Sequence, residues 1–140
     1  MNDISIVIPV LNEEDSLSDL IEELDDLINE MNEKSIEIIF VDDGSTDKTN
    51  SILKEQIINK EYIKLITLVR NFGQTAAISA GIDNAKGNIL ITMDSDLQNS
   101  SKDIPRLIEQ LENGYDVVSG WRKERRDNYL TRIIPSKIAN

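Results

Sequence analysis

Two aspartates separated by one residue, Asp94 and Asp96, have the residue types and spacing best suited to chemistry in this chain. They follow the apolar run 88–93, so both side chains can reach one crevice where the chain leaves a buried strand. Carboxylate oxygens are ligands that Mg²⁺ and Mn²⁺ prefer, and Gln98 could add a neutral oxygen. Such a cation keeps positions open for phosphate oxygens, which indicates a nucleoside diphosphate compound as the ligand. The local alternative is that Asp94 caps a turn and Asp96 begins a helix.

A second pair of carboxylates, Asp42 and Asp43, follows the apolar run 36–41. Adjacent carboxylates repel each other, which suggests that at least one accepts a hydrogen bond from a ligand, such as a ring N–H of uracil or guanine. The alternative is a turn leading into a helix, because Asp, Ser and Thr side chains accept hydrogen bonds from the first amides of helices. In either case we expect Ser45 or Thr46 to be the N-cap.

Other polar residues near the ends of apolar runs also have ordinary interpretations. Asn12 is expected to be a helix N-cap, followed by acidic residues that favour a first turn. Arg70 and Arg122 could each pair with a phosphate through two hydrogen bonds, or could form surface ion pairs. Gln74 at a helix start and Gly81 within the same helix fit close packing of that helix onto a sheet.

The composition excludes several kinds of chemistry. The 140 residues include no histidine and no cysteine, which removes Ser-His-Asp catalysis, thiolate nucleophiles and thiolate metal sites. With 15 basic and 26 acidic residues the net charge is −11, which argues against nucleic acid as a partner. Neither G-x-x-x-x-G-K-[ST] nor G-x-G-x-x-G occurs, so P-loop nucleotidases and dinucleotide-dependent dehydrogenases lose their main support.

The elements that must position these residues are short strands alternating with helices. Five apolar runs rich in β-branched residues recur at intervals of about 25–30 residues, the rhythm of βαβ units in a mostly parallel sheet. The stretches between them repeat apolar residues at helical spacing or end at stop signals such as Gly87 and Gly114. The expected strands are 4–8, 36–41, 63–69, 88–93 and 115–119, and the expected helices are 17–31, 47–58, 74–85 and 103–114.

These elements predict an α/β fold with a doubly wound, mostly parallel sheet over residues 1–120. In an open sheet of this kind, ligands bind outside the carboxyl ends of the strands. We therefore expect five strand ends to converge on one rim, four of them carrying charged or amide side chains. Residues 121–140 differ, because they are basic and end without a closing element. This pattern is the one expected of the front part of a longer protein.

Five segments taken together resemble the family 2 glycosyltransferases of the GT-A fold. The resemblance is closest to the enzymes that act on polyprenyl phosphates, such as dolichol-phosphate mannose synthases and undecaprenyl-phosphate sugar transferases. One segment alone is weakly specific, whereas five in the family's order over nearly the whole chain are highly specific. The matching segments are 7–14, 41–47, 70–74, 93–98, and 114–118 followed by Arg122. Ser95 stands where the family more often has alanine.

The resemblance implies a metal-dependent site for a nucleotide sugar. Asp94 and Asp96, with Gln98, would hold Mg²⁺ or Mn²⁺ against the donor diphosphate, while Val41 and Asp43 would contact the base. Basic residues after position 120 would lie near the donor phosphates and in the loop that meets the acceptor. The expected substrate-binding residues are Pro9, Leu11, Glu13, Val41, Asp43, Gln74, Ser95, Arg122, Arg125 and Arg126.

The implied reaction is inverting transfer of a sugar from a nucleoside-diphosphate sugar to a polyprenyl phosphate. The family also carries a further aspartate, which we expect beyond Asn140 together with C-terminal amphipathic or transmembrane helices. No apolar run of this chain approaches the length of a membrane span, which favours a cytoplasmic protein. Its basic end or the expected helices would hold it at the cytoplasmic face of a membrane.

Several alternatives stay open at the level of the sequence. A non-catalytic protein that binds a nucleotide sugar would need the same pocket, and a transferase could act on a soluble or polysaccharide acceptor. A phosphohydrolase with an aspartyl nucleophile usually has its D-x-D after the first strand, whereas here it follows the fourth predicted strand. A receiver-type domain would carry its acidic pair after the first strand, whereas here the pair follows the second. The base, the sugar, the acceptor and the oligomeric state are left open.

Overall fold

The structure is a computed structural model that describes residues 2–96 and 101–120 of the 140-residue chain. The chain divides into two compact units, Met1–Pro105 and Arg106–Asn140. The strands of the first unit are β1 (Ile4–Val10), β2 (Ile36–Asp42), β3 (Ile63–Thr67) and β4 (Ile89–Thr92). Its helices are α1 (Leu17–Glu30), α2 (Thr49–Asn59) and α3 (Gln74–Asn84), followed by a 3-10 turn at Ser101–Asp103. Helix α4 (Ile104–Glu112) begins at the end of the first unit.

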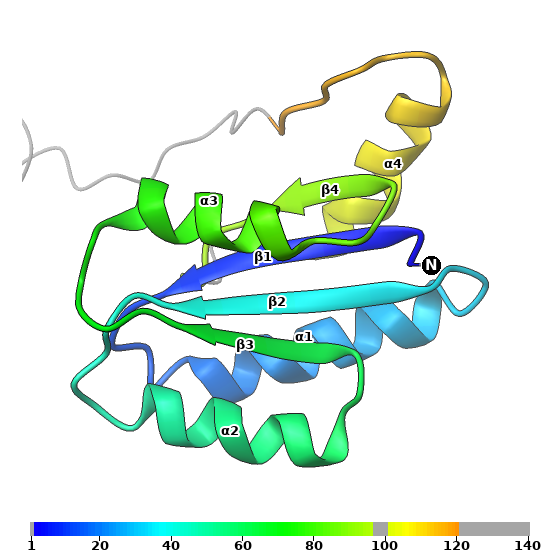
Figure 1. Ribbon diagram of the computed structural model, residues 1–140. Helices are drawn as coiled ribbons and strands as arrows, with labels where there is room; N and C mark the ends of the chain where they lie inside the picture. Colours follow the sequence, from blue (N-terminus) through cyan, green and yellow to red (C-terminus); the bar gives the residue numbers. More distant parts are fainter. Residues whose placement is uncertain (1, 97–100, 121–140) are drawn as a thin grey trace, which may run out of the picture. The chain divides into compact units, whose positions relative to one another are not determined.

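The four strands form one parallel sheet in the order β3-β2-β1-β4, as drawn in Figure 1. β1 is paired on both sides, with Ile4 opposite Ile36 of β2 and opposite Ile89 of β4. Every residue of β1 and β2 is buried, which explains why these segments are continuous apolar runs rather than alternating ones. The predicted α/β fold with a parallel sheet is confirmed.

The prediction of a fifth strand over residues 115–119 is wrong. Residues 113–120 form no strand, and Tyr115 and Val117 are 62% and 84% exposed. β-branched and aromatic residues favour a strand only where a neighbouring strand completes the backbone hydrogen bonds and covers one face. The stop of the preceding helix was predicted correctly, because α4 ends at Glu112 and Gly114 has a φ of +104°.

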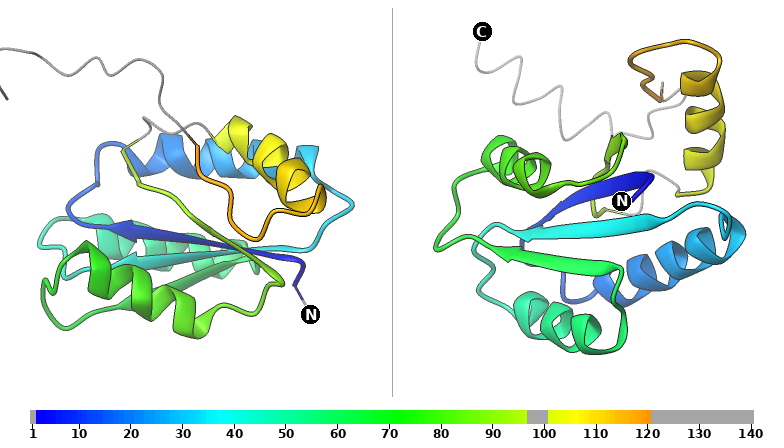
Figure 2. Two further views of the ribbon diagram at one scale, coloured as in Figure 1. Left: turned by 90° about the horizontal axis from the view of Figure 1, so that it is seen from above. Right: turned by 45° about the vertical axis from the view of Figure 1, so that its right-hand side comes forward.

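Helices cover both faces of the sheet, so the fold is doubly wound. Helix α3 lies on one face, and α1 and α2 lie on the other (Figures 1 and 2). Val7, Val41 and Ala77 belong to the apolar core under α3. Gly81 permits this close approach, since a Cβ at that position would be 2.3 Å from Cγ1 of Val7. The expected packing of a helix onto the sheet through Gly81 is confirmed.

A buried polar group of residues lies at the amino ends of the strands on the α3 side, and we call it the amino-end cluster. Ser5 donates to Oε1 of Glu37 at 2.5 Å, the backbone N–H of Lys86 donates to the same oxygen at 2.6 Å, and Gly87 donates to Ser5. Lys64 forms an ion pair with the other oxygen of Glu37. Burial alone would raise the pKa of Glu37, but these donors lower that pKa to about 2.

The chain order creates a crevice at the opposite end of the sheet. The first three strands are added in one direction, and the chain then crosses back over β2 and β1 to place β4 beside β1. The direction in which strands are added therefore reverses beside β1, and in open α/β sheets ligands bind at the carboxyl ends of the strands at such a reversal. The segment after β4 leads to the face that carries α1, where the backbone N–H of Ser101 donates to Glu23 at 2.7 Å. Within the described part of the chain, none of the helices is long and apolar enough to span a bilayer.

Candidate functional site

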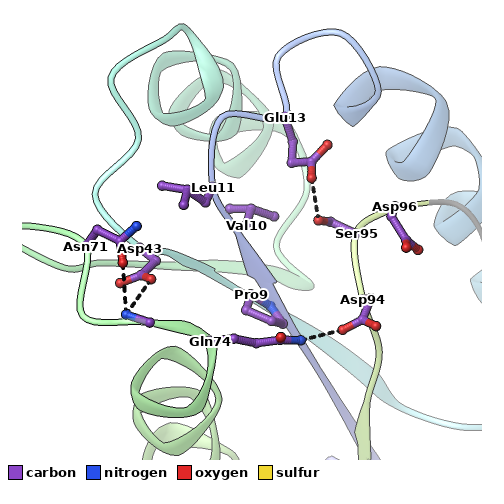
Figure 3. A pocket seen from close by; sticks show the side chains of 11 residues that line it. Pro9, Val10, Leu11, Glu13, Asp43, Asn71, Gln74, Asp94, Ser95 and Asp96 are labelled. Atoms are coloured by element: carbon purple, nitrogen blue, oxygen red, sulfur yellow. Dashed lines mark hydrogen bonds between the residues drawn. The ribbon is translucent and has the colours of Figure 1, made fainter. Parts of the chain in front are cut away.

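A pocket of about 390 Å³ opens at the carboxyl ends of the four strands. Figure 3 shows its side chains, which come from the end of β1, the loops that follow the four strands and the first residue of α3. The predicted convergence of polar strand ends is therefore confirmed for these four strands. The lining residues are Pro9, Val10, Leu11, Glu13, Asp43, Asn71, Gly73, Gln74, Asp94, Ser95 and Asp96.

Asp43 holds the loop between β3 and α3 against the pocket. Its Oδ1 accepts a hydrogen bond from the backbone N–H of Phe72 at 2.8 Å, and its Oδ2 accepts one from Gly73 at 2.9 Å. Asn71 adds a third bond to this loop, because its Oδ1 accepts from the same N–H of Gly73 at 3.0 Å. Each carboxylate oxygen has a second lone pair, so Asp43 can still accept a bond from a ligand.

Asp42 has different partners from those of its neighbour. Its Oδ1 accepts from the backbone N–H of Ser45 at 2.9 Å, and its Oδ2 accepts from the side-chain amide of Asn50 at 2.6 Å. Both adjacent carboxylates are thus satisfied within the fold. Their repulsion by itself does not require a ligand, and Asp42 has the role of a turn residue.

Gly44 lets two loops of the rim touch each other. It has a φ of +79°, and a Cβ there would be 2.5 Å from the backbone carbonyl carbon of Arg70. No other residue type fits this combination of a left-handed backbone and a close approach without strain. The loops after β2 and β3 are therefore held in contact, which keeps Asp43 beside Gly73.

The predicted helix caps after β1 and β2 are wrong. Asn12 lies outside α1 with a φ of +54°, and its Oδ1 accepts from the backbone N–H of Thr46 at 2.8 Å. Ser45 accepts from the backbone N–H of Asn12 at 3.0 Å. The residues at the N-cap positions, Ser16 and Lys48, make no side-chain capping bond. Oδ1 of Asn12 and the hydroxyl oxygen of Ser45 therefore accept hydrogen bonds across the rim, from the other loop, instead of capping a helix.

Glu13 connects three elements at the edge of the pocket. Its backbone N–H donates to the buried hydroxyl of Thr49 at 2.8 Å. One side-chain oxygen accepts from Ser16 at 2.7 Å, and the other accepts from Ser95 at 3.2 Å. Ser95 is only 7% exposed, so this contact lies where β4 ends, between the two aspartates of the D-x-D segment. Figure 3 shows Glu13 and Ser95 facing each other across the pocket edge.

Asp94 and Asp96 lie on one side of the pocket, with Gln74 opposite Asp94 (Figure 3). The side-chain amide of Gln74 donates to Oδ1 of Asp94 at 2.6 Å. Together with Glu13 and Asp43, these aspartates give the pocket four acidic side chains, and its described lining includes no lysine or arginine. A strongly anionic ligand would be repelled from such a site unless it entered with a cation.

The residues present fit a hard divalent cation. Within residues 2–96 and 101–120, no three acidic, histidine or cysteine side chains come close enough to enclose a metal. Asp94 and Asp96 nevertheless supply two carboxylates beside an open volume. One or two carboxylates completed by water and substrate phosphates is the usual arrangement for Mg²⁺, whereas a cage built entirely of protein ligands is not.

The structure places the predicted site residues in three groups. Those that line the pocket are Pro9, Leu11, Glu13, Asp43, Gln74, Asp94, Ser95 and Asp96. Val41 is fully buried in the core under α3 and is not part of the lining. Gln98, Arg122, Arg125 and Arg126 lie outside the described residues. The lining also includes Val10, Asn71 and Gly73, which were not among the predicted site residues; the signal for Asn71 and Gly73 is the position of segment 70–74 at a strand end.

The comparison with protein families gives one match over almost the whole chain. Residues 5–138 match the family described as Glycosyl transferase family 2. A dodecaprenyl-phosphate galacturonate synthase of Rhizobium johnstonii is 43% identical over 99% of this chain and 41% of its own length. An undecaprenyl-phosphate 4-deoxy-4-formamido-L-arabinose transferase of Pseudomonas fluorescens is 44% identical over 98% of this chain and 40% of its own length.

A solved structure with the same arrangement of elements is a mannosyltransferase from Pyrobaculum calidifontis in complex with GDP-Man and Mn²⁺. It superposes with a TM-score of 0.71 over 93% of this chain and 40% of its own, at 19% identity, which is a likeness of fold. The chain spans about two fifths of the length of the curated relatives named above.

Proposed function

The chain belongs to glycosyl transferase family 2 and has a GT-A fold, and we propose that it transfers a sugar from a nucleoside-diphosphate sugar to a polyprenyl phosphate. The two curated relatives support this acceptor. Their names carry different sugars, galacturonate in one and 4-deoxy-4-formamido-L-arabinose in the other, but both names carry a polyprenyl phosphate. The shared part of the two names is therefore the acceptor, and the sugar stays open for this chain.

The observation that carries the proposal is the pocket at the carboxyl ends of the strands. Its volume of about 390 Å³ is in the range of small-molecule sites, about 300–1,000 Å³. Asp43 lies toward one end and Asp94 and Asp96 toward the other, as Figure 3 shows. We propose that the base binds at the Asp43 end, where a carboxylate oxygen can accept a ring N–H, and that the diphosphate lies beside Asp94 and Asp96.

The acidic lining supports a requirement for Mg²⁺ or Mn²⁺. Four carboxylates and a diphosphate would repel one another, and the described lining offers no basic side chain to offset that repulsion. Asp94 and Asp96 would hold the cation, and Gln98 is proposed as a neutral third ligand. When bound, the cation offsets the charge that develops on the departing diphosphate.

The proposed reaction is a single in-line displacement with inversion at the anomeric carbon. A phosphate oxygen of the acceptor forms a bond to that carbon while the bond from the carbon to the diphosphate oxygen breaks. The electron pair leaves with the nucleoside diphosphate. Because the acceptor phosphate is already anionic, no proton must be removed from it, and alignment of the two substrates is the main requirement.

We propose that the reaction takes place at a membrane surface, which the polyprenyl phosphate acceptor and the basic segment 121–140 support. Six basic side chains between 122 and 137 would attract phosphate groups of the acceptor and of surrounding lipids. Arg122, Arg125 and Arg126 are proposed to contact these phosphates. We propose that this surface is the cytoplasmic face of a membrane, where nucleotide sugars are available.

Calorimetric titration tests the donor site directly. The 140-residue protein is titrated with UDP and with GDP, each with and without Mn²⁺, and the expected result is metal-dependent binding of one of the two. Asp96→Ala should weaken that binding by more than the ~10–100-fold that an outer-shell contact to a metal is worth. Failure of the folded protein to bind either nucleotide with Mn²⁺ would contradict the proposed site.

A second assay separates an enzyme from a non-catalytic nucleotide-sugar-binding protein. The protein is incubated with the radiolabelled donor of the preferred base, Mn²⁺ and a polyprenyl phosphate in detergent, and the label that enters the organic phase is counted. Label in the lipid supports transfer. Tight donor binding with no label in the lipid would favour the binding protein.

A further inference from the structure

Hydrogen bonds on either side of the backbone step from Gly73 to Gln74 link the two acidic ends of the pocket. Asp43 accepts from the backbone amides of Phe72 and Gly73, and Gly73 is the residue immediately before α3. Gln74, the first residue of α3, then donates from its side chain to Asp94. The carboxylate at the base end thus determines where the backbone before Gln74 lies, and Gln74 contacts the carboxylate at the metal end.

The hydrogen bond from Gln74 to Asp94 has the geometry expected of a residue that orients a metal ligand. Its amide reaches Oδ1 of Asp94 at 2.6 Å and leaves Oδ2 without this bond. The donor is neutral, so it holds the carboxylate without competing for it as a cation would. Gln74 is exposed, and within the described residues its side chain makes this one hydrogen bond.

We propose that Gln74 is a positioning residue that orients Asp94 for binding of Mg²⁺ or Mn²⁺. This inference rests on the proposed function, in which Asp94 and Asp96 are the metal ligands. A carboxylate that binds a metal is typically oriented by a hydrogen bond from a second residue, and loss of such a bond costs about 10–100-fold in metal affinity. Gln74 therefore acts through Asp94 and differs from a residue that contacts the donor.

Gln74→Met is the variant that isolates this contact. Methionine has a similar length and a similar helix propensity, so α3 should still begin at this position, but its side chain cannot donate a hydrogen bond. Thr75→Val is the matched control, because it changes the next residue of the same helix end, which is exposed and does not line the pocket. Thermal unfolding without metal should give the same midpoint for both variants and the wild type.

The measurement is the affinity for Mn²⁺ alone and for Mn²⁺ with the nucleotide that the wild type prefers, from the electron paramagnetic resonance signal of free Mn²⁺. In Gln74→Met the dissociation constant for Mn²⁺ should rise about 10-fold, both without and with nucleotide, whereas Thr75→Val should bind like the wild type. An effect present without nucleotide distinguishes positioning of Asp94 from a contact with the donor.

Two outcomes would overturn the inference, and they are distinguishable. If the wild type binds Mn²⁺ and Asp96→Ala does not, while Gln74→Met keeps the wild-type dissociation constant within twofold, Gln74 has no positioning role. If the wild type binds no Mn²⁺ with either UDP or GDP, the metal site of the proposed function is wrong and the role of Gln74 fails with it.

Discussion

The carboxylates at the two ends of the sheet differ in whether the fold itself compensates their negative charge. At the amino end, Glu37 is 2% exposed and receives an ammonium, a hydroxyl and a backbone amide from its own fold. At the carboxyl end, the pocket gathers four acidic side chains, and its described lining has no basic residue. The partner that Asp94 has is a neutral amide. The negative charge of Glu37 in the amino-end cluster is therefore balanced by Lys64 of the same fold. The pocket carries negative charge that no basic side chain of its described lining balances, and it is suited to a bound cation.

Structural and functional carboxylates of this molecule can be distinguished by the partners that neutralise them. A buried carboxylate whose hydrogen bonds and counter-charge all come from the fold has no need of a ligand, and removal of one of its partners destabilises the fold. A carboxylate that is oriented by a neutral hydrogen-bond donor, with no basic side chain to neutralise it, keeps a negative charge that can bind a cation. Asp43 lies between these extremes, since two backbone amides hold it while it still faces the pocket.

The largest effect is expected from Lys64→Met, which tests whether the amino-end cluster serves stability independently of the pocket. The substitution leaves Glu37 buried without its counter-charge, and because Lys64 is itself 39% exposed we expect a loss of about 1–3 kcal/mol in the free energy of unfolding. Chemical denaturation measures that loss. Nucleotide binding with Mn²⁺ should stay at the wild-type level in the folded variant, and a parallel loss of binding would show that the two ends are not independent.

The next effect is expected in the pH dependence of stability. The pKa of Glu37 is about 2 in the fold against an ordinary value of 4.5, so its contribution is fully present above pH 4.5 and is lost as the pH falls toward 2. Glu37→Gln removes this titration and should give a shallower decline of the unfolding free energy in that pH range. Equal slopes for the wild type and the variant would contradict the assigned role of the ion pair.

The smallest effect is expected from Ser95→Ala, which tests the other end. It removes the hydrogen bond of 3.2 Å to Glu13 while leaving Asp94 and Asp96 in place. At 3.2 Å this bond is longer than the usual O–H···O distance, so we expect it to contribute no more than an ordinary hydrogen bond, about 0.5–1.5 kcal/mol. Nucleotide affinity with Mn²⁺ should therefore fall by about 2- to 10-fold. Calorimetry measures this change, and Ser79→Ala on the exposed side of α3 is the control. A loss as large as that of Asp96→Ala would mean that Ser95 has more than a supporting role.

Much of the fold could be predicted because its signals are local. The apolar runs at 4–8 and 36–41 became central strands that are buried on both faces, and the stop at Gly114 followed α4 as expected. The exception is 115–119, which has strand-forming residues but no strand in the described part of the chain. Propensity is a property of a segment, whereas a strand also depends on a neighbour that completes its hydrogen bonds.

The candidate site was predictable in outline but not in its contacts. Parallel strands bring their carboxyl ends to one edge, so Asp43, Asp94 and Asp96 could be placed at a common pocket from their positions after apolar runs. The partners of Asn12 could not be found in this way. Its side chain bonds to Thr46, 34 positions along the chain, and a local cap was the simpler prediction.

Periodicity and residue type act over short distances along the chain, so they were enough to predict the α/β architecture, the convergence of polar strand ends and the oxygen-rich chemistry of the site. Only the tertiary structure decided which carboxylates are satisfied within the fold. Asp42 and Asp43 are adjacent and chemically identical, yet one bonds to its own turn and to Asn50 of α2, and the other holds the loop before α3. The physical reason is that short polar side chains take whichever donors the packing of distant elements brings within about 3 Å of them.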